Sequence, residues 1–170
     1  SMLQPLVDPR GLKYEPDPRG ILSARSAVAH YYRQLGVELP EQRILLTAST
    51  SEAYSFLFKL LADPGDEILS PRPSYPLFEF LAGLSSVSIR QYPLRYDGAW
   101  HIDFATLRAS ISPQTRAIVL VNPNNPTGSY LKQDEREELE SLALTHGLAI
   151  ISDEVFCDYG ISASTNRVTT

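Results

Sequence analysis

Two short polar segments follow two apolar runs of the chain, and both carry side chains that can bind a ligand. The segment Asn122-Pro-Asn-Asn-Pro-Thr-Gly128 comes directly after Ala117–Val121, and Ser152-Asp153-Glu154 ends a second apolar run. Apolar, β-branched runs of this length are typical of buried strands, and the two prolines end regular structure in the first segment. In an open parallel α/β sheet, ligands bind at the carboxyl ends of the strands. We therefore expect an amide, such as that of Asn125, and the Asp153 carboxylate at a ligand-binding edge.

The order and spacing of several motifs resemble the fold type I family of pyridoxal 5'-phosphate (PLP) enzymes, in particular the class I/II aminotransferases. The motifs run almost from end to end: Tyr14-Glu-Pro-Asp-Pro-Arg-Gly20, Leu46-Thr-Ala-Ser-Thr-Ser-Glu-Ala53, Asp63-Pro-Gly-Asp-Glu67, Pro73-Ser-Tyr-Pro76, the Asn122–Gly128 segment and Asp153-Glu-Val-Phe156. The resemblance implies PLP as cofactor. It also implies transfer of an amino group between an amino acid and a 2-oxo acid, which would be the substrates.

The resemblance places three residues around the cofactor ring. Asp153 would lie against the ring nitrogen and keep it protonated, so that the ring can act as an electron sink. Asn125 would donate a hydrogen bond to the ring 3'-oxygen. Phe156 stands where many members of the family have a tyrosine that donates a second such bond, so we expect the 3'-oxyanion to be less stabilised here. From the residues alone, a loop carboxylate at Asp153 and a proline-rich turn at Asn125 stay open as alternatives.

Other residues correspond to the positions that hold the phosphate and the ring plane in the family. The phosphate would be cradled by Ser49, Thr50 and Ser51. Backbone N–H groups and hydroxyls at a helix start bind a dianion well, although Ser49-x-x-Glu52 is also a capping box in its own right. Tyr75 would stack on the pyridine ring, or else belong to the core. Tyr14 would reach the phosphate of the cofactor in the other subunit of a homodimer, or else be an exposed residue of an arm.

The hydrophobic pattern predicts an α/β fold in which strands and helices alternate. Helices are expected over residues 21–35, 51–62, 75–83, 103–110 and 133–146. Strands are expected over residues 43–47, 67–70, 87–93, 117–121 and 148–152. This alternation implies a three-layer α/β/α sandwich with a mostly parallel sheet. Residues 1–20 are proline-rich and predict an N-terminal arm or linker, and residues 21–170 predict part of a PLP-binding large domain. The resemblance further implies a cis Asn125-Pro126 peptide.

The composition favours a cytoplasmic protein that acts on small molecules. Of the 170 residues, 43% are hydrophobic and 21% are charged, which is ordinary for a globular domain. The net charge of −5 is spread along the chain without a basic stripe, so neither nucleic acid nor a membrane is an expected partner. Cys157 is the single cysteine and the three histidines show no ligand spacing, so no disulfide or metal site is predicted. No membrane-spanning run or signal peptide is evident.

In the family, the lysine that holds PLP as a Schiff base follows the Asp153 motif by a few tens of residues. The lysines of this chain, Lys13, Lys59 and Lys132, do not lie in that register. We therefore expect a truncated, inactive part of the large domain that has no catalytic residue of its own. We also expect this chain to form homodimers. Two alternatives stay open: a PLP-dependent carbon–sulfur lyase of the same fold, and a non-catalytic remnant that acts as a binding or dimerising module.

Overall fold

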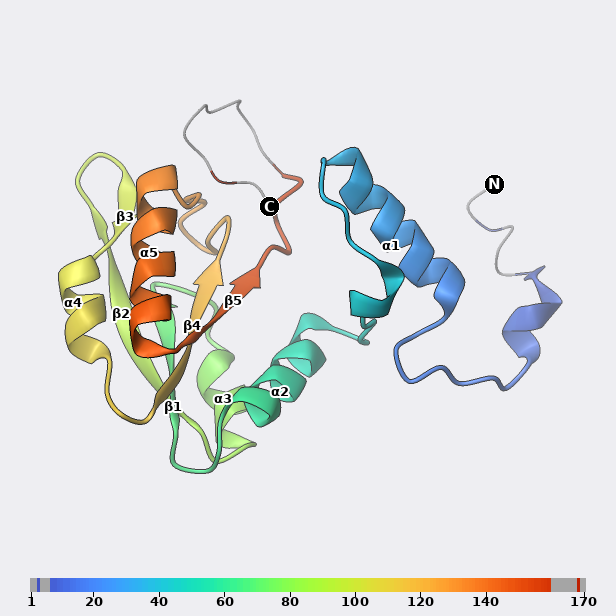
Figure 1. Ribbon diagram of the computed structural model, residues 1–170, viewed down its shortest axis with the longest axis horizontal. Helices are drawn as coiled ribbons and strands as arrows, with labels where there is room; N and C mark the ends of the chain where they lie inside the picture. The colour runs from blue at the N-terminus through green and yellow to red at the C-terminus, as the bar shows by residue number, and fades with distance from the viewer. Residues whose placement is uncertain (1–2, 4–6, 160–167, 169–170) are drawn as a thin grey trace. The chain divides into compact units, whose positions relative to one another are not determined.

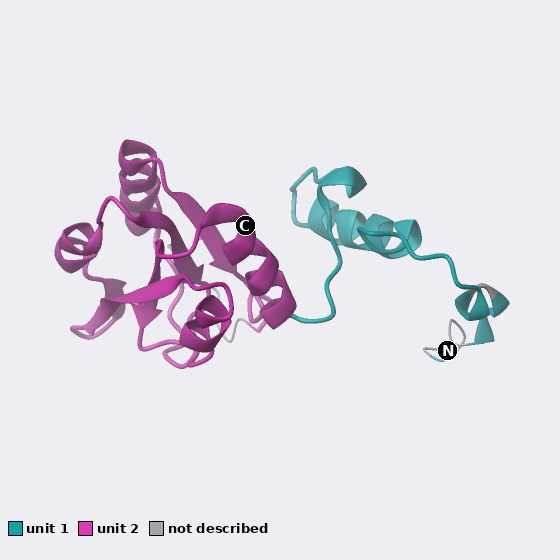
Figure 2. Cartoon of the chain, turned by 90° about the horizontal axis from the view of Figure 1, so that it is seen from below, with its two compact units in different colours: residues 1–49, 170 teal, residues 50–169 magenta. Residues whose placement is uncertain are grey.

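The computed structural model describes residue 3, residues 7–159 and residue 168 of the chain. Backbone contacts divide the chain into two compact units, residues 1–49 and residues 50–169 (Figure 2). We refer to them as the N-terminal unit and the sheet unit. The expected division after residue 20, into an arm and a large domain, stays a prediction.

The N-terminal unit is organised around one buried arginine. Its described elements are η2 (Pro9–Leu12), α1 (Leu22–Gln34) and η3 (Glu41–Arg43). Arg25 in α1 is only 4% exposed. Its guanidinium donates to the carbonyl oxygen of Gly20 at 2.8 Å, to that of Glu41 at 2.9 Å and to Asp17 Oδ2 at 3.0 Å. A buried guanidinium needs acceptors for its donors, so these bonds hold α1 against the segments that precede and follow it.

The prediction of a strand over residues 43–47 is wrong. Arg43 ends the short helix η3, and residues 44–47 are extended but belong to no strand. The backbone N–H of Leu46 donates to the carbonyl oxygen of Arg19 at 2.9 Å. An extended apolar segment forms a strand only where a neighbouring segment supplies a ladder of backbone hydrogen bonds. Within the described part of this unit, the bond between Leu46 and Arg19 does not extend into such a ladder.

The described residues of the sheet unit form five strands in the order β3-β2-β1-β4-β5 (Figure 1). The strands are β1 (Glu67–Arg72), β2 (Ser88–Tyr96), β3 (Trp100–Ile102), β4 (Thr115–Val121) and β5 (Ala149–Asp153). All neighbouring pairs are parallel except β2 and β3, which are antiparallel. This mostly parallel sheet confirms the predicted α/β fold class.

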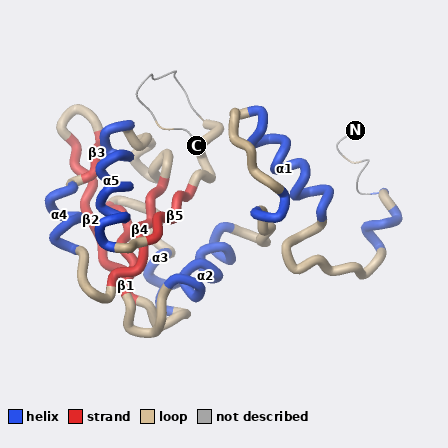
Figure 3. The backbone as a smooth tube through the Cα atoms, viewed as in Figure 1, coloured by secondary structure: helices blue, strands red, loops and turns tan. Residues whose placement is uncertain are grey.

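Helices cover both faces of this sheet, because its central strands are apolar on both sides. The helices are α2 (Thr50–Leu61), α3 (Phe78–Gly83), α4 (Phe104–Ser110) and α5 (Gln133–His146) (Figure 3). One core cluster joins α2 and α3 to the sheet and includes Tyr54, Phe58, Ile68, Phe78 and Val119. The other joins α4 and α5 to the opposite face and includes Leu69, Tyr92, Leu107, Ile118 and Leu139. Neighbouring residues of a strand thus serve different cores, as the two-residue period requires.

Helix α3 begins three residues later than expected. Pro76 disfavours the helical conformation for the preceding residue, so Tyr75 stays outside the helix, which starts at Phe78. Helix α5 has the expected bounds, because Gly147 ends it in the left-handed conformation, with φ of 65°. Within the described residues, no helix is both long enough and apolar enough to cross a membrane.

The antiparallel strand β3 was not expected. The chain reverses at Asp97-Gly98, where Gly98 has φ of 108°. An Asp-Gly pair between two extended runs is a strong hairpin signal, so this turn was open to prediction from the sequence.

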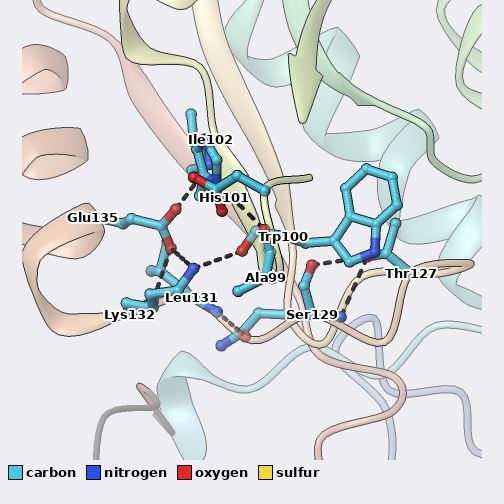
Figure 4. Close-up of polar contacts among 11 residues, drawn as sticks. Ala99, Trp100, His101, Ile102, Thr127, Ser129, Leu131, Lys132 and Glu135 are labelled. Carbon is cyan, nitrogen blue, oxygen red and sulfur yellow. Dashed lines mark hydrogen bonds and ion pairs between the residues drawn. The ribbon is translucent and has the colours of Figure 1, made fainter. Parts of the chain in front are cut away.

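A buried glutamate fastens the hairpin to α5 (Figure 4). Glu135 is 7% exposed and accepts hydrogen bonds from the backbone N–H groups of Ile102 at 2.8 Å and Lys132 at 3.0 Å. Lys132 Nζ donates to the carbonyl oxygen of Trp100 at 2.6 Å and lies 3.3 Å from Glu135 Oε2. These contacts join the start of α5 to the edge strand, and they occupy both carboxylate oxygens.

Candidate functional site

The candidate site lies at the carboxyl ends of β4 and β5. The two strands are parallel neighbours, with Val121 opposite Asp153. Directly after β4, the backbone N–H of Asn122 donates to the carbonyl oxygen of Asp153 at 2.8 Å. The Asn122–Gly128 loop and Asp153 therefore begin at the same edge of the sheet.

Asp153 is half-buried, and each of its carboxylate oxygens accepts one hydrogen bond. Tyr54 Oη donates to Oδ2 at 2.7 Å, and the backbone N–H of Val155 donates to Oδ1 at 3.1 Å. Strand alternation places the Asp153 side chain on the same face as Ile151, the face covered by α2 and α3. The carboxylate thus keeps free acceptor positions on both oxygens and partial access to solvent.

Tyr54 is nearly fully buried in α2, at 4% exposure. Burial, together with the nearby Asp153 carboxylate, raises the pKa of the Tyr54 hydroxyl far above its usual value. The hydroxyl is therefore protonated at neutral pH and can donate to Asp153. Sequence reasoning missed this residue. A tyrosine on the apolar face of a helix, one turn after a candidate phosphate site, was the available signal, because a buried phenol needs a partner.

The three asparagines of the Asn122–Gly128 loop have different surroundings. Asn122 and Asn124 are buried, at 4% and 5% exposure, whereas Asn125 is exposed. The Asn122 amide donates to the carbonyl oxygen of Val168 at 3.1 Å and accepts from the backbone N–H of Leu131 at 3.0 Å. The first asparagine therefore holds the loop on the α5 face of the sheet.

Asn124 ties the same loop to the segment that follows β1. Its amide donates to the carbonyl oxygen of Pro73 at 3.1 Å and to Thr127 Oγ1 at 2.9 Å. The peptide between Asn125 and Pro126 is cis, which confirms that prediction. The amide N–H groups of Asn122 and Asn124 are thus used within the fold, whereas Asn125, in the loop after β4, is exposed.

Tyr75 follows Pro73, the residue that Asn124 contacts. Its ring is 37% exposed and meets Phe78 edge-on, with ring centroids 6.1 Å apart and planes at 79°. A cavity of about 460 Å³ opens beside it, lined by Arg72, Ser74 and Gln91 among others. Asp153 and Asn125 are not among its described lining residues. The candidate site is therefore defined by the side chains at the β4 and β5 edge and not by the cavity volume.

The predicted phosphate-binding residues are consecutive in the chain, and the division into two units falls between Ser49 and Thr50. Thr50 and Ser51 begin α2, one turn before Tyr54, so the first turn of this helix is connected to Asp153 through the tyrosine. Ser51 uses its carbonyl oxygen to accept from Ser55 Oγ at 3.0 Å. Ser49 is the last residue of the N-terminal unit. Its part in phosphate binding stays a prediction.

Two further predicted residues are exposed. Tyr14, in the N-terminal unit, has 91% of its surface accessible, and its contact with another subunit stays a prediction. Phe156, in the turn after β5, is 42% exposed and lies against Tyr159, with ring centroids 6.1 Å apart. Its place beside a cofactor ring stays a prediction as well.

The side chains at this edge suit a flat, cationic and phosphorylated ligand. Asp153 offers a fixed carboxylate with unused acceptor positions, which fits a protonated ring nitrogen. The first turn of α2 offers N–H groups and hydroxyls from Thr50 and Ser51, which fit a phosphate. PLP has both features.

Comparisons with known proteins agree with this chemistry. The family model described as "Aminotransferase class I and II" matches residues 3–169. The chain is 36% identical over 138 residues to nicotianamine aminotransferase 1 of Oryza sativa subsp. japonica, covering 81% of this chain and 28% of that protein. It is also 36% identical over 148 residues to S-alkyl-thiohydroximate lyase SUR1 of Arabidopsis thaliana, covering 86% and 32%.

A solved structure shares the fold. Alanine aminotransferase from Pyrococcus furiosus superposes with a TM-score of 0.83 at 31% identity, over 95% of this chain and 41% of that one. The chain spans about a third of the length of the two curated relatives.

Proposed function

Because this chain belongs to the aminotransferase class I and II family, we propose that it binds PLP and serves amino-group transfer between an amino acid and a 2-oxo acid. The family depends on PLP in general. The observation that carries the proposal is the half-buried Asp153 carboxylate at the end of β5, next to the Asn122–Gly128 loop and held by Tyr54.

Each residue at this edge has a role that its chemistry supports. When bound, PLP supplies a protonated pyridine ring that withdraws electrons from the substrate carbon. Asp153 holds the proton on the ring nitrogen, since a carboxylate stabilises a nearby cation. Asn125 donates its amide N–H to the ring 3'-oxygen. Tyr75 covers a face of the ring by stacking.

The remaining roles concern the phosphate and the apolar side of the ring. The phosphate is bound by Ser49, Thr50 and Ser51, whose N–H groups stand at the positive end of α2. Phe156 contributes apolar surface and no hydrogen bond. In a homodimer, Tyr14 donates its hydroxyl to the phosphate bound by the other subunit.

We further propose that the chain by itself does not complete the transfer, because its lysines are committed or badly placed. Lys132 Nζ is bound to the Trp100 carbonyl oxygen, with Glu135 beside it, on the α5 face. Lys59 is exposed in the last turn of α2, and Lys13 pairs with Glu15 in the N-terminal unit. Borohydride treatment of the chain with PLP, followed by mass spectrometry, should give no stoichiometric pyridoxyl group. One such group per chain on any of these lysines would contradict the proposal.

Cofactor binding itself is tested by titrating the chain with PLP and following absorbance. We expect weak, reversible binding that Asp153→Asn weakens about tenfold, since a hydrogen bond to a charged group contributes roughly 1.5–3 kcal/mol. The matched control is Asp97→Asn, which changes an exposed carboxylate at the β2–β3 turn. Equal affinity of the Asp153 and Asp97 variants would exclude Asp153 as a ligand for the ring.

A carbon–sulfur lyase is the second candidate, because the chain is as similar to the thiohydroximate lyase as to the aminotransferase of rice. The residues proposed above to hold the cofactor would serve either reaction. Thiol release from an S-alkyl substrate would favour the lyase, and formation of an amino acid from a 2-oxo acid would favour the aminotransferase. Absence of both products with PLP bound fits a cofactor-binding part, and absence of PLP binding favours a non-catalytic module.

We also propose that the chain forms homodimers. Apolar side chains remain exposed on α2 and α3, including Phe56 at 49%, Leu60 at 78% and Phe80 at 70%. Among the described residues, β5 is one of the two outer strands of the sheet, so its outer edge can pair with another chain. Light scattering across a dilution series should give twice the monomer mass at high concentration. A monomer at every concentration would contradict this.

A further inference from the structure

We propose that Tyr54 is a positioning residue that fixes the Asp153 carboxylate for the cofactor, an inference that rests on the function proposed above. Tyr54 Oη donates to Asp153 Oδ2 at 2.7 Å, across 99 residues of sequence. The contact joins α2, which carries the phosphate-binding residues, to β5, which carries the carboxylate.

The ring of Tyr54 is held tightly by its neighbours. It lies edge-on to Phe78, with centroids 5.1 Å apart and planes at 80°, and tilted against Phe58 at 5.6 Å. Both neighbours belong to the core, at 2% and 0% exposure. Because the ring cannot turn away without opening this core, the direction of the hydroxyl is set by packing.

Two donors then define the orientation of the carboxylate. Tyr54 binds Oδ2, and the backbone N–H of Val155 binds Oδ1 at 3.1 Å. A carboxylate held at both oxygens has lost rotation about its Cβ–Cγ bond. It meets a cationic ring nitrogen without a further ordering cost, which is the advantage of a preorganised site.

The Tyr54 hydroxyl donates to one oxygen of the carboxylate from the side of α2, and the acceptor positions that remain on Asp153 are open to a ring nitrogen. Tyr54 therefore acts on the cofactor through Asp153 and does not need to touch the ring.

The test is a double-mutant cycle on PLP affinity. Tyr54→Phe removes only the hydroxyl, and we expect it to weaken PLP binding about fivefold, the usual size of one hydrogen bond. In an Asp153→Ala background, which leaves no side-chain acceptor for Tyr54, the same change should leave the affinity unaltered, because Tyr54 acts through the carboxylate. Equal weakening in both backgrounds, or none in either, would overturn the proposal.

The matched control is Tyr92→Phe on the opposite face of the sheet. Tyr92 is fully buried and donates its hydroxyl to the carbonyl oxygen of Val119 at 2.8 Å. Its loss should lower the melting temperature at least as much as Tyr54→Phe does, with PLP affinity unchanged. A general loosening of the sheet would instead lower PLP affinity in both variants, which counts against a positioning role.

If the chain does not bind PLP, the proposed function fails. A second measurement then still tests whether Tyr54 holds Asp153. Thermal unfolding of Tyr54→Phe, Asp153→Ala and the double variant gives the coupling between the two side chains directly. We expect the double variant to lose less stability than the sum of the single variants. Strict additivity would show that Tyr54 does not hold Asp153.

Discussion

Glu135 and Asp153 are carboxylates on opposite faces of one sheet, and they differ in burial and in the number of hydrogen-bond donors around them. Glu135 is buried, and both of its oxygens are taken by donors from Ile102 and Lys132. Asp153 is half-buried and keeps free acceptor positions beside a hydroxyl and one N–H. Glu135 has three donors around it and is buried, so this carboxylate holds the fold together. Asp153 has two donors and is partly exposed, so it is fixed and can also receive a ligand.

The largest effect should separate the two carboxylates by stability. Glu135→Ala leaves the buried N–H group of Ile102 without its partner and frees Lys132, so we expect a loss of about 3–5 kcal/mol in the free energy of unfolding. Asp153→Ala should lower it by about 1 kcal/mol, because water can reach that edge. Urea unfolding followed by circular dichroism measures both. Equal losses would remove the distinction between a structural and a ligand-binding carboxylate.

The same contrast applies to the asparagines of the Asn122–Gly128 loop. Asn124→Ala breaks the buried link to Pro73, and we expect a loss of about 2 kcal/mol. Asn125→Ala changes an exposed side chain and should cost less than about 0.5 kcal/mol while weakening PLP binding. The pair should be compared by urea unfolding and by PLP titration. A larger stability loss at Asn125 would show that its amide belongs to the fold.

Acid should affect the carboxylates that hold structure. Hydrogen bonds from Thr106, with Arg95 nearby, lower the pKa of Asp103 below its ordinary value of 3.8, and the backbone N–H of Asp63, with Arg116, lowers that of Asp66. A lowered pKa means that the folded state favours the ionised form. This stability is therefore complete above the ordinary pKa and is lost as the pH falls below about 4.

Melting temperatures between pH 6 and pH 2 measure this acid dependence. The wild type should lose stability below about pH 4, and Asp66→Asn should show a shallower decline, since one of the titrating groups is gone. Identical pH profiles for wild type and variant would contradict the assignment of Asp66.

The smallest effect should come from a surface carboxylate in the same helix as Glu135. Glu140 pairs with Arg136 at 2.7 Å, and both side chains are about half exposed. We expect Glu140→Gln to change the free energy of unfolding by at most about 0.5 kcal/mol, an effect that salt abolishes. If Glu140→Gln lowered the free energy of unfolding as much as Glu135→Ala does, burial would not explain the larger effect expected at Glu135.

Local signals predicted much of the sheet unit. Gly147 marked the end of α5, and the apolar runs before Asn122 and Asp153 marked β4 and β5 as buried strands. Parallel pairing followed from the alternation of strands and helices, so the shared edge of Asn125 and Asp153 could be stated in advance. The Asp97-Gly98 pair is a local turn signal of the same kind, although the prediction did not include its hairpin.

The sequence by itself determined which side chains stand at the ends of β4 and β5, because strand period, proline and glycine act over a few residues. Only the tertiary structure decided that residues 44–47 pair with no strand and that Tyr54 reaches Asp153 from a helix 99 residues earlier. It also decided which asparagine side chains of the Asn122–Gly128 loop form hydrogen bonds within the protein. These outcomes depend on contacts between distant segments, and such contacts are set by packing and partner geometry rather than by local preference.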